Sequence, residues 1–185
     1  MNLGTVKLKI DGKDVTAQEG ETILRVAEEN GISIPTLCFL EGLSVLGGCR
    51  LCLVQVKGSP RLFPACTTPV SNRLEVITES EKLQKYRRIA VELLLSERTH
   101  ICAACVANGS CELQDMATKL GVDHVGLKRE WTMHKIDSSH EQLVLDRNRC
   151  ILCTRCIRVC DEIEGVHTLD LKTRGKDSQI IIDLN

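Results

Sequence analysis

The sequence predicts an α+β protein, and three observations lead to this class. Apolar and polar residues alternate near the N-terminus, as they do in strands, and an apolar stripe with helical spacing follows in the middle of the chain. All eleven cysteines fall into three groups. Aromatic residues make up only 2% of the 185 residues, so we expect bound metal to supply part of the folding energy, because metal binding to an unformed site is coupled to folding.

The first predicted domain, residues 1–78, opens with a β-hairpin. Apolar residues alternate with polar ones over positions 6–10, Asp11-Gly12 supplies a turn, and a return strand begins at Val15.

A helix and two further strands complete this domain. Thr22 is expected to cap a helix over Ile23–Asn30, which Gly31 ends. Strands are predicted over Cys52–Lys57 and around Leu74–Ile77. The order of two strands, a helix and two more strands resembles a β-grasp fold.

The second predicted segment, residues 79–142, is helical. An apolar stripe predicts a helix that begins after a capping Ser80 and ends near Ser96. Another helix is expected over Cys111–Leu120, and residues 121–142 are polar and weakly patterned.

The third predicted segment, residues 143–185, contains the last cysteine group and a strand over Ser178–Leu184. This strand leads toward the end of the chain, so we expect the sequence to be a fragment of a longer subunit that continues after Asn185.

Charge and hydropathy narrow the class of protein. The net charge of −1 lacks the basic character of a nucleic-acid binder. No apolar run approaches the roughly 18 residues of a membrane span, and the N-terminus has no signal-peptide pattern. We therefore expect a cytoplasmic protein. A reducing cytosol disfavours disulfides, and eleven cysteines cannot all pair within one chain.

The first cysteine group has the spacing C-x10-C-x2-C-x13-C and comprises Cys38, Cys49, Cys52 and Cys66. Thiolates are soft ligands that select iron–sulfur clusters, zinc or cuprous copper. A [2Fe–2S] cluster needs four converging thiolates, and a structural zinc site with four thiolates is the alternative. Glycines before Cys49 suit a loop that wraps a cluster, because they allow unusual backbone angles.

The second group, with the spacing C-x2-C-x5-C, comprises Cys102, Cys105 and Cys111. Three thiolates leave one iron of a [4Fe–4S] cube without a ligand. His100 is the nearest candidate for that position, and His124 and His134 are the alternatives.

The third group has the bacterial-ferredoxin spacing C-x2-C-x2-C-x3-C. We expect Cys150, Cys153 and Cys156 to hold one [4Fe–4S] cube and Cys160 to serve an additional cluster, although Cys160 or a partner chain could instead complete the first cube. Asp161 replaces the proline that usually follows such a run. Structural zinc is again an alternative.

Charged residues near the third group have both functional and structural interpretations. Arginines surround the group and either offset the charge of its cluster, dock an acidic partner or form an exposed face: Arg147, Arg149, Arg155 and Arg158. Three carboxylates could carry protons, but a solvated acidic face is the simpler interpretation: Asp146, Glu162 and Glu164. The chain has no dinucleotide fingerprint, no P-loop and no cysteine left for nickel, so we expect no catalytic residue and no NAD or flavin site.

Several phrases carry a resemblance to a known family. Gly48–Val54 and Ala65–Val70 resemble the N-terminal ferredoxin domain shared by the large iron–sulfur subunit of respiratory complex I, iron-only hydrogenases and NAD-reducing hydrogenases. Cys111-Glu112-Leu113-Gln114 is similar to the sequence that follows their cluster with one His and three Cys ligands. In those proteins the usual spacing is H-x3-C, and Arg98 occupies that position here.

The middle and the end of the chain resemble one member of this group. Leu95–Cys102, Cys105–Gly109, Leu120–Val125 and Cys160–Gly165 look like the small iron–sulfur subunit of the diaphorase half of bidirectional NAD-reducing [NiFe] hydrogenases. The resemblance implies a [2Fe–2S] cluster on the first group and [4Fe–4S] clusters on the others. It also implies electron transfer between the [NiFe] hydrogenase small and large subunits and a partner that binds FMN and NAD.

Two rival functions remain open at this point. The chain could be the N-terminal part of an electron-input subunit of an NADH:quinone oxidoreductase, a formate dehydrogenase or an iron-only hydrogenase. It could also be a zinc-stabilised interaction module without redox function.

Overall fold

The structure, a computed structural model, describes residues 4–128 and 132–182. The chain divides into two units. The first unit runs to Phe39 and resumes at Val45–Ala90, and the second comprises Leu40–Ser44 and the chain from Val91 onward. The three predicted segments, 1–78, 79–142 and 143–185, stay a prediction.

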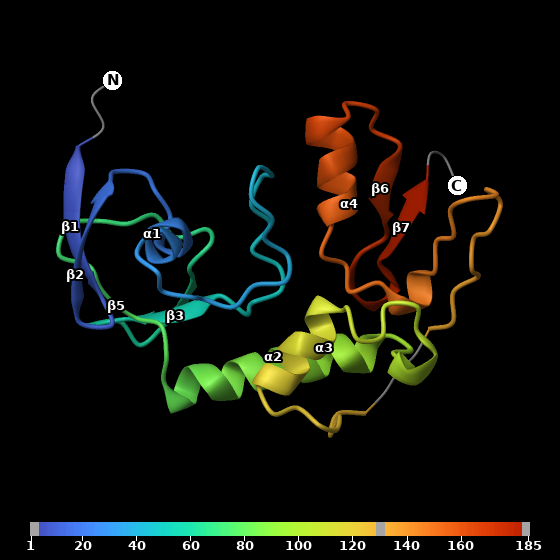
Figure 1. The fold of residues 1–185 in the computed structure, drawn as a ribbon, viewed down its shortest axis with the longest axis horizontal. Helices are drawn as coiled ribbons and strands as arrows, with labels where there is room; N and C mark the ends of the chain where they lie inside the picture. Colours follow the sequence, from blue (N-terminus) through green and yellow to red (C-terminus); the bar gives the residue numbers. More distant parts are fainter. Residues whose placement is uncertain (1–3, 129–131, 183–185) are drawn as a thin grey trace. The chain divides into compact units, whose positions relative to one another are not determined.

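A mixed sheet forms the first unit, as the β-grasp prediction requires (Figure 1). Its strands, in the described part of the chain, follow the order β2-β1-β5-β3-β4. Strands β1 and β5 are parallel, and the other neighbours are antiparallel. The bounds are β1 Thr5–Ile10, β2 Lys13–Gln18, β3 Leu53–Val56, β4 Leu62–Pro64 and β5 Glu75–Ile77.

The predicted turn joins β1 to β2. Ile10 pairs with Lys13, which leaves a two-residue loop of Asp11 and Gly12 with φ angles of 49° and 82°. Two positive φ angles are typical of the type I′ turn that matches strand twist. The Asp11 carboxylate also accepts hydrogen bonds from the Thr78 backbone N (2.7 Å) and hydroxyl (2.5 Å), so the turn is held against the end of β5.

Helix α1 (Ile23–Glu29) packs its apolar side into the core of this unit. The Thr22 hydroxyl accepts a hydrogen bond from the Arg25 backbone N, as predicted for the cap. The inward side chains are almost fully buried: Ile23, Leu24, Val26 and Ala27. A buried side chain the size of leucine contributes about 1.5–3 kcal/mol relative to exposure, so this helix fixes the sheet below the first cysteine group.

Strand β4 was not predicted. Leu62–Pro64 is only three residues long and ends on a proline, which normally argues against a strand. It lies at the edge of the sheet, beside β3 alone, and proline is tolerated at an edge because it need not donate a hydrogen bond there.

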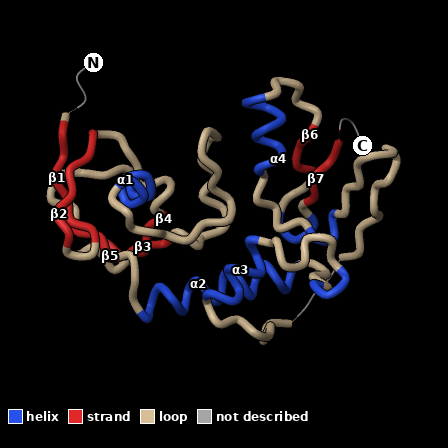
Figure 2. Tube along the Cα trace, viewed as in Figure 1, coloured by secondary structure: helices blue, strands red, loops and turns tan. Residues whose placement is uncertain are grey.

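Helix α2 (Glu81–Glu97) begins in the first unit and continues into the second. The Ser80 hydroxyl accepts a hydrogen bond from the Leu83 backbone N at 3.2 Å, which confirms the predicted cap. Helix α3 (Glu112–Lys119) and a short helix α4 (Arg155–Arg158) follow, and a five-residue π-helical turn, η3 (Val159–Ile163), continues α4. Loops make up much of the chain after α2 (Figure 2).

The described chain ends in an antiparallel hairpin of β6 (Leu169–Lys172) and β7 (Gln179–Ile182). Strand β7 lies within the predicted strand Ser178–Leu184, whose last two residues are outside the described residues. Strand β6 was not predicted. It has only four residues, and three of them are exposed. No helix in ranges 4–128 and 132–182 is long and apolar enough to cross a membrane.

Candidate metal centres

Strand pairing brings two cysteines of the first group together. Cys52 directly precedes β3, and Cys66 lies two residues after β4. Leu53 pairs with Pro64, and the Ala65 backbone N donates to the Cys52 carbonyl at 2.9 Å. The two sulfurs are therefore 3.3 Å apart and share a hydrogen bond. That bond lowers the pKa of Cys52 to about 7 and raises the pKa of Cys66.

Cys38 and Cys49 form a second pair in this site. A hydrogen bond in which the Cys49 thiol donates to the Cys38 sulfur, together with burial, raises the pKa of Cys49. The negative charges of Cys52, Cys38 and Cys49 all raise the pKa of Cys66 further, so these sulfurs lie within electrostatic reach of Cys66. Like charges at this separation favour a bound cation, because each thiolate otherwise destabilises its neighbours.

The loop before Cys49 has the backbone that its sequence predicts. Gly47 has a φ of 66°, and a Cβ there would lie 3.0 Å from the Thr67 methyl group. Arg50, between Cys49 and Cys52, has a φ of 58°. Positive φ in a residue other than glycine costs about 1–3 kcal/mol and persists only where the surroundings impose it. The loop that carries Cys49 and Cys52 therefore adopts a backbone conformation with an unfavourable φ angle at Arg50.

The second group lies around the short turn η1 (Cys102–Ala104) and the start of α3. The loop from Cys105 to Cys111 is braced by Gln114 of α3, which accepts from the Gly109 backbone N (3.0 Å) and donates to the Asn108 side chain (2.9 Å). The glutamine of the Cys111-Glu112-Leu113-Gln114 motif therefore fixes the preceding cysteine loop. The spacing of the cysteines alone does not indicate this role.

His100 and His124 line the same cavity as Cys102, with a volume of about 230 Å³. The Nε2 atom of His100 lies 3.2 Å from the Leu94 carbonyl. A carbonyl only accepts, so Nε2 carries the proton and Nδ1 is left with its lone pair. Burial lowers the pKa of His100, and the charges of Arg149 and Arg98 act in the same direction, which keeps the ring neutral.

His134 and Arg98 belong to a different network. The Arg98 guanidinium donates to His134 Nε2 at 2.9 Å and to the Ser178 carbonyl at 2.5 Å. The His134 backbone N donates to the Asn148 side chain at 2.7 Å. Arg98, at the position to which the resemblance assigns a histidine, therefore joins the start of β7 to the 132–148 segment.

Two backbone residues of the third group have a left-handed conformation. Leu152 and Thr154 have φ angles of 53° and 55°, and the Leu152 backbone N lies 3.4 Å from the Cys150 sulfur as a donor. Burial raises the pKa values of Cys150 and Cys156, and the charge of Cys153 adds to both. These three thiols therefore lie within electrostatic reach of one another.

Cys160 differs from the other three cysteines in its partners. It is buried in η3, and Thr168 contacts its sulfur through the backbone N and the hydroxyl, both at 3.3 Å. The Thr168 hydroxyl lowers the pKa of Cys160. Thr168 was not singled out from the sequence, because nothing in the spacing marks it as a partner of a cysteine eight residues away.

The predicted arginines have separate structural tasks. Arg149 hydrogen-bonds the Cys105 sulfur and lowers the pKa of that thiol, after a larger contribution from the Ala107 backbone N. Arg155 pairs with Glu112 at 2.6 Å, next to Cys111. Both residues thus connect the third group to the second. Arg147 donates to the Ile180 carbonyl at 2.6 Å.

Arg158 is buried and holds the third loop together. It donates to the Thr154 hydroxyl at 3.2 Å and to the Cys153 carbonyl at 3.1 Å, and also to the Ser44 carbonyl. Glu162 accepts from the Ser44 backbone N at 2.6 Å, and Asp146 accepts from the Asn148 backbone N and Arg149 at 3.0 Å each. These contacts give Glu162 and Asp146 anchoring tasks.

In ranges 4–128 and 132–182, no three His, Cys, Asp or Glu side chains are grouped to hold a single metal ion. The folded chain provides paired and neighbouring thiols. Such soft, clustered donors fit iron–sulfur clusters, whose several iron atoms distribute the ligands over a larger volume.

Three protein families match successive parts of the chain. Residues 4–81 match the 2Fe-2S iron-sulfur cluster binding domain, and residues 87–126 match the NADH-ubiquinone oxidoreductase-G iron-sulfur binding region. Residues 141–184 match the ferredoxin-like domain of NADH-quinone oxidoreductase subunit 3. The cofactors are accordingly a [2Fe–2S] cluster and [4Fe–4S] clusters.

Two similar proteins are much longer than this chain. The alpha subunit of a Geobacter sulfurreducens NADPH-Fe(3+) oxidoreductase is 40% identical over 171 residues, which are 92% of this chain and 20% of that protein. The mitochondrial NADH-ubiquinone oxidoreductase 78 kDa subunit of Candida albicans is 33% identical over 96% of this chain and 25% of its own length. The chain thus spans a quarter or less of these relatives.

Other similarities cover most of both proteins. A crystal structure of an NAD+-reducing [NiFe]-hydrogenase in the H2-reduced state contains a chain with a TM-score of 0.90 and 34% identity, over 96% of this chain and 74% of that one. The gamma subunit of the NAD-reducing hydrogenase HoxS of Cupriavidus necator is 36% identical over 97% of this chain and 76% of its own. The chain therefore belongs to the family of the iron–sulfur gamma subunits of NAD-reducing hydrogenases.

Proposed function

We propose that this chain is the electron-transfer subunit that connects a [NiFe] hydrogenase module to a diaphorase partner carrying FMN and NAD. The observation that carries this proposal is the 36% identity to a hydrogenase gamma subunit over 76% of that subunit. The three cysteine groups support it, because the clusters supply one-electron carriers when bound. The chain itself contributes no catalytic residue in this proposal.

In the first site, the pairs of sulfurs support a distribution of the four ligands over the two irons. Cys38 and Cys49 share one hydrogen bond, and Cys52 and Cys66 share another. Each pair would bind one iron of the [2Fe–2S] cluster. The Cys52–Cys66 pair is held by the β3–β4 ladder, so this half of the site needs little rearrangement to receive its iron.

In the second site, Cys102, Cys105 and Cys111 would supply three ligands and His100 the fourth. A histidine that ligates a metal commonly donates its other ring N–H to a backbone carbonyl, which fixes the tautomer. The contact from His100 Nε2 to the Leu94 carbonyl has this form, so Nδ1 would be the ligand atom. His124 lines the same cavity and is the alternative, whereas the Arg98 contact occupies His134.

In the third site, Cys150, Cys153 and Cys156 would hold one cube, and Cys160 would serve an additional cluster. Cys150 interacts with the charges of Cys153 and Cys156, while Cys160 is engaged by Thr168. The alternative is that Cys160 completes the same cube: its charge contributes to the raised pKa of Cys156, and a ligating sulfur can keep its hydrogen bonds with Thr168.

The partners in this proposal are a flavin- and NAD-binding diaphorase subunit and the small and large subunits of a [NiFe] hydrogenase. We place the assembly in the cytoplasm, because thiolate ligands are preserved in a reducing compartment. The residues of this chain position the clusters, exclude water from Cys38, Cys52 and Cys66, which are each 1% exposed, and tune potentials through nearby charges.

The test is to purify the chain with its natural partners and measure hydrogen-dependent NAD+ reduction, together with iron, sulfide and zinc contents. We expect activity in the complex, iron and sulfide in the chain, and EPR signals of both cluster types after reduction. A His100→Ala variant should shift the potential of one [4Fe–4S] signal. Zinc without a paramagnetic signal would instead identify a structural interaction module.

A second candidate function is electron input to an NADH:quinone oxidoreductase or a related enzyme, as a fragment. The 40% identity to the NADPH-Fe(3+) oxidoreductase subunit favours it. Copurification with a protein that lacks nickel, and NADH oxidation that does not respond to hydrogen, would support this candidate and contradict the hydrogenase assignment. Comparing NADH with NADPH in the same assay would identify the nucleotide.

A further inference from the structure

One arginine of α2 is buried, unlike the basic residues beside it. Arg87 is 1% exposed, whereas Lys85 and Arg88 of the same helix are exposed. Burying a charged side chain is costly unless it is paired and hydrogen-bonded. A residue retained in such a place therefore needs a specific set of partners.

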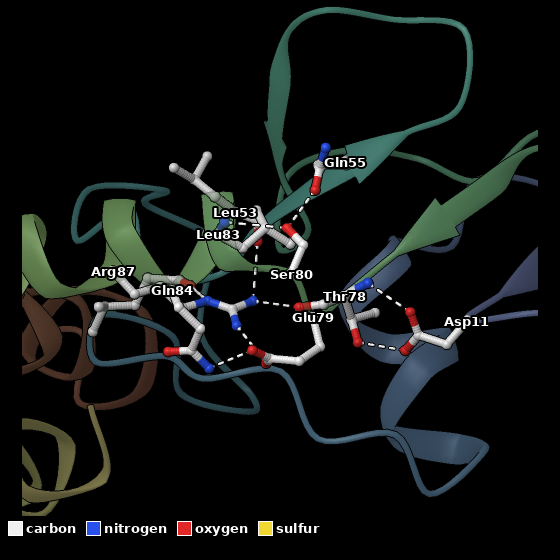
Figure 3. A network of polar contacts seen from close by, with 10 residues as sticks. Asp11, Leu53, Gln55, Thr78, Glu79, Ser80, Leu83, Gln84 and Arg87 are labelled. Atoms are coloured by element: carbon white, nitrogen blue, oxygen red, sulfur yellow. Dashed lines mark hydrogen bonds and ion pairs between the residues drawn. The ribbon is translucent and has the colours of Figure 1, made fainter. Parts of the chain in front are cut away.

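The guanidinium of Arg87 has four such partners, all in the first unit, and Figure 3 labels three of them, Leu53, Thr78 and Glu79. It donates to the Leu51 carbonyl at 3.1 Å, the Leu53 carbonyl at 3.1 Å and the Thr78 carbonyl at 2.8 Å. It also forms an ion pair with the Glu79 carboxylate at 3.0 Å.

Two of these carbonyls belong to the residues on either side of Cys52. The planar guanidinium presents several N–H groups in a fixed fork, which a lysine ammonium cannot reproduce. By holding both the Leu51 and the Leu53 carbonyls, Arg87 fixes the peptide group before Cys52 and the one after Leu53, and the Cys52 carbonyl between them accepts from the Ala65 backbone N. The orientation of the Cys52 side chain follows from that backbone.

The charge of Arg87 also reaches the site. Burial lowers the pKa of Arg87, while the charges of Glu79 and of the Cys52 thiolate oppose that change. Arginine nevertheless remains protonated in proteins. Reduction adds a negative charge to a cluster, and cluster potentials respond to nearby charge and hydrogen bonds. A buried cation beside Cys52 thus favours the reduced form.

We propose that Arg87 is a positioning residue of the first cysteine site, which holds Cys52 in its ligating conformation and stabilises the reduced form of the [2Fe–2S] cluster. This inference rests on the proposed cluster. The competing explanation is that Arg87 only attaches α2 to the sheet, in which case its removal would lower stability without changing the redox equilibrium.

The test is a redox titration of the [2Fe–2S] EPR signal in the full, iron-loaded chain. In Arg87→Met, we expect the ratio of reduced to oxidised cluster, measured at the wild-type midpoint potential, to fall about tenfold or more, because a buried cation that interacts with the Cys52 charge is removed. Lys85→Met removes an exposed charge from the same helix and should leave the ratio within about twofold, because exposed charges are screened.

Two further variants test charge and position separately. Glu79→Gln leaves Arg87 in place but removes its counter-charge, so the ratio should rise, by a few-fold at most, because the Glu79 side chain is 59% exposed. Arg87→Lys keeps the charge and loses the fork. We expect a ratio close to the wild type but a faster loss of iron to a chelator.

An unchanged ratio in Arg87→Met with an intact signal would overturn the inference, as would a fall in the ratio in Glu79→Gln. If Arg87→Met does not fold, a ratio that fails to rise in Glu79→Gln overturns the charge effect, and iron loss at the wild-type rate in Arg87→Lys overturns the positioning role. A wild-type chain without any [2Fe–2S] signal would overturn the proposed function, and this inference with it. If the wild type shows the [2Fe–2S] signal but Arg87→Met leaves the ratio of reduced to oxidised cluster unchanged, this inference is overturned and the proposed function is not.

Discussion

The two units hold their cysteines by different means. In the first unit, sixteen buried residues form one apolar cluster that includes Cys52 and Cys66. In the second, the buried apolar residues among those described are few and separated along the chain: Val91, Leu113, Leu120, Cys160 and Ile180. The first site is therefore prepared by a core of hydrophobic residues, whereas the second and third depend on polar braces and on the clusters themselves.

Removal of iron should produce the largest difference in local stability between the two units. Metal binding to a site without its own core supplies folding energy, so we expect the amides of residues 102–111 and 150–160 to lose hydrogen-exchange protection by about 100-fold or more in the apoprotein. Amides of β1 and β3 should stay within about tenfold of their protection in the iron-loaded chain. Hydrogen exchange with mass spectrometry measures both units. Equal losses of protection would show that the apolar cluster of the first unit does not stay folded without iron.

Truncation of a core leucine comes next in size. Leu24 is 0% exposed in the first unit, and Leu24→Ala should lower the free energy of unfolding of that unit by about 2–5 kcal/mol. The matched change Leu171→Ala, on a β6 residue that is 41% exposed, should cost less than about 1 kcal/mol. Urea unfolding followed by circular dichroism measures both, and similar costs would contradict the contrast between the units.

Loss of the Gln114 brace should have a smaller effect, confined to the second site. Gln114→Ala removes two hydrogen bonds from the loop between Cys105 and Cys111, at a cost of about 1–3 kcal/mol in total. We expect faster loss of iron from one [4Fe–4S] cluster, followed by its EPR signal, while the [2Fe–2S] signal persists. The exposed neighbour Asp115 provides a control in Asp115→Ala. An equal loss of both signals would contradict a local brace.

The smallest effect concerns an exposed ion pair of the first unit. The Lys57 ammonium, 2.7 Å from Glu75, lowers the pKa of that carboxyl group. A depressed pKa in the folded state gives stability above the ordinary value of about 4.3, which is lost as the pH falls through the folded pKa. The difference in urea midpoint between the wild type and Glu75→Gln should therefore shrink below about pH 4.5. Lys57→Met should lose the same pH-dependent stability as Glu75→Gln. A difference in urea midpoint between wild type and Glu75→Gln that grows on acidification would contradict this prediction.

Much of the first unit could be predicted from the sequence because its signals are local. Alternation predicted β1, Asp11-Gly12 predicted the turn, and Thr22 predicted the cap of α1. The return strand was expected from Val15, and β2 begins two residues earlier, at Lys13. The cysteines could be grouped by spacing for the same reason. Strands β4 and β6 were missed because each has only three or four residues, too few for an alternating pattern, and β4 ends on a proline.

The residues that support the sites were harder to predict. Arg87 bonds to carbonyls 9, 34 and 36 residues away, and in the sequence it is one of several basic residues in a helix. Gln114 was visible only as part of a resemblance. His100 could be proposed from proximity to Cys102, but its contact with the Leu94 carbonyl depends on how the chain turns after α2.

The register between β3 and β4 has a consequence for how this family can vary in length. Leu53 faces Pro64 across the ladder, and side chains alternate between the faces of a sheet. An insertion between Cys52 and Val54 would turn the Cys52 sulfur to the opposite face, whereas an insertion at Lys57–Arg61 would only enlarge the connecting loop. Homologues that differ in the distance between their third and fourth cysteines should therefore gain or lose residues in that loop.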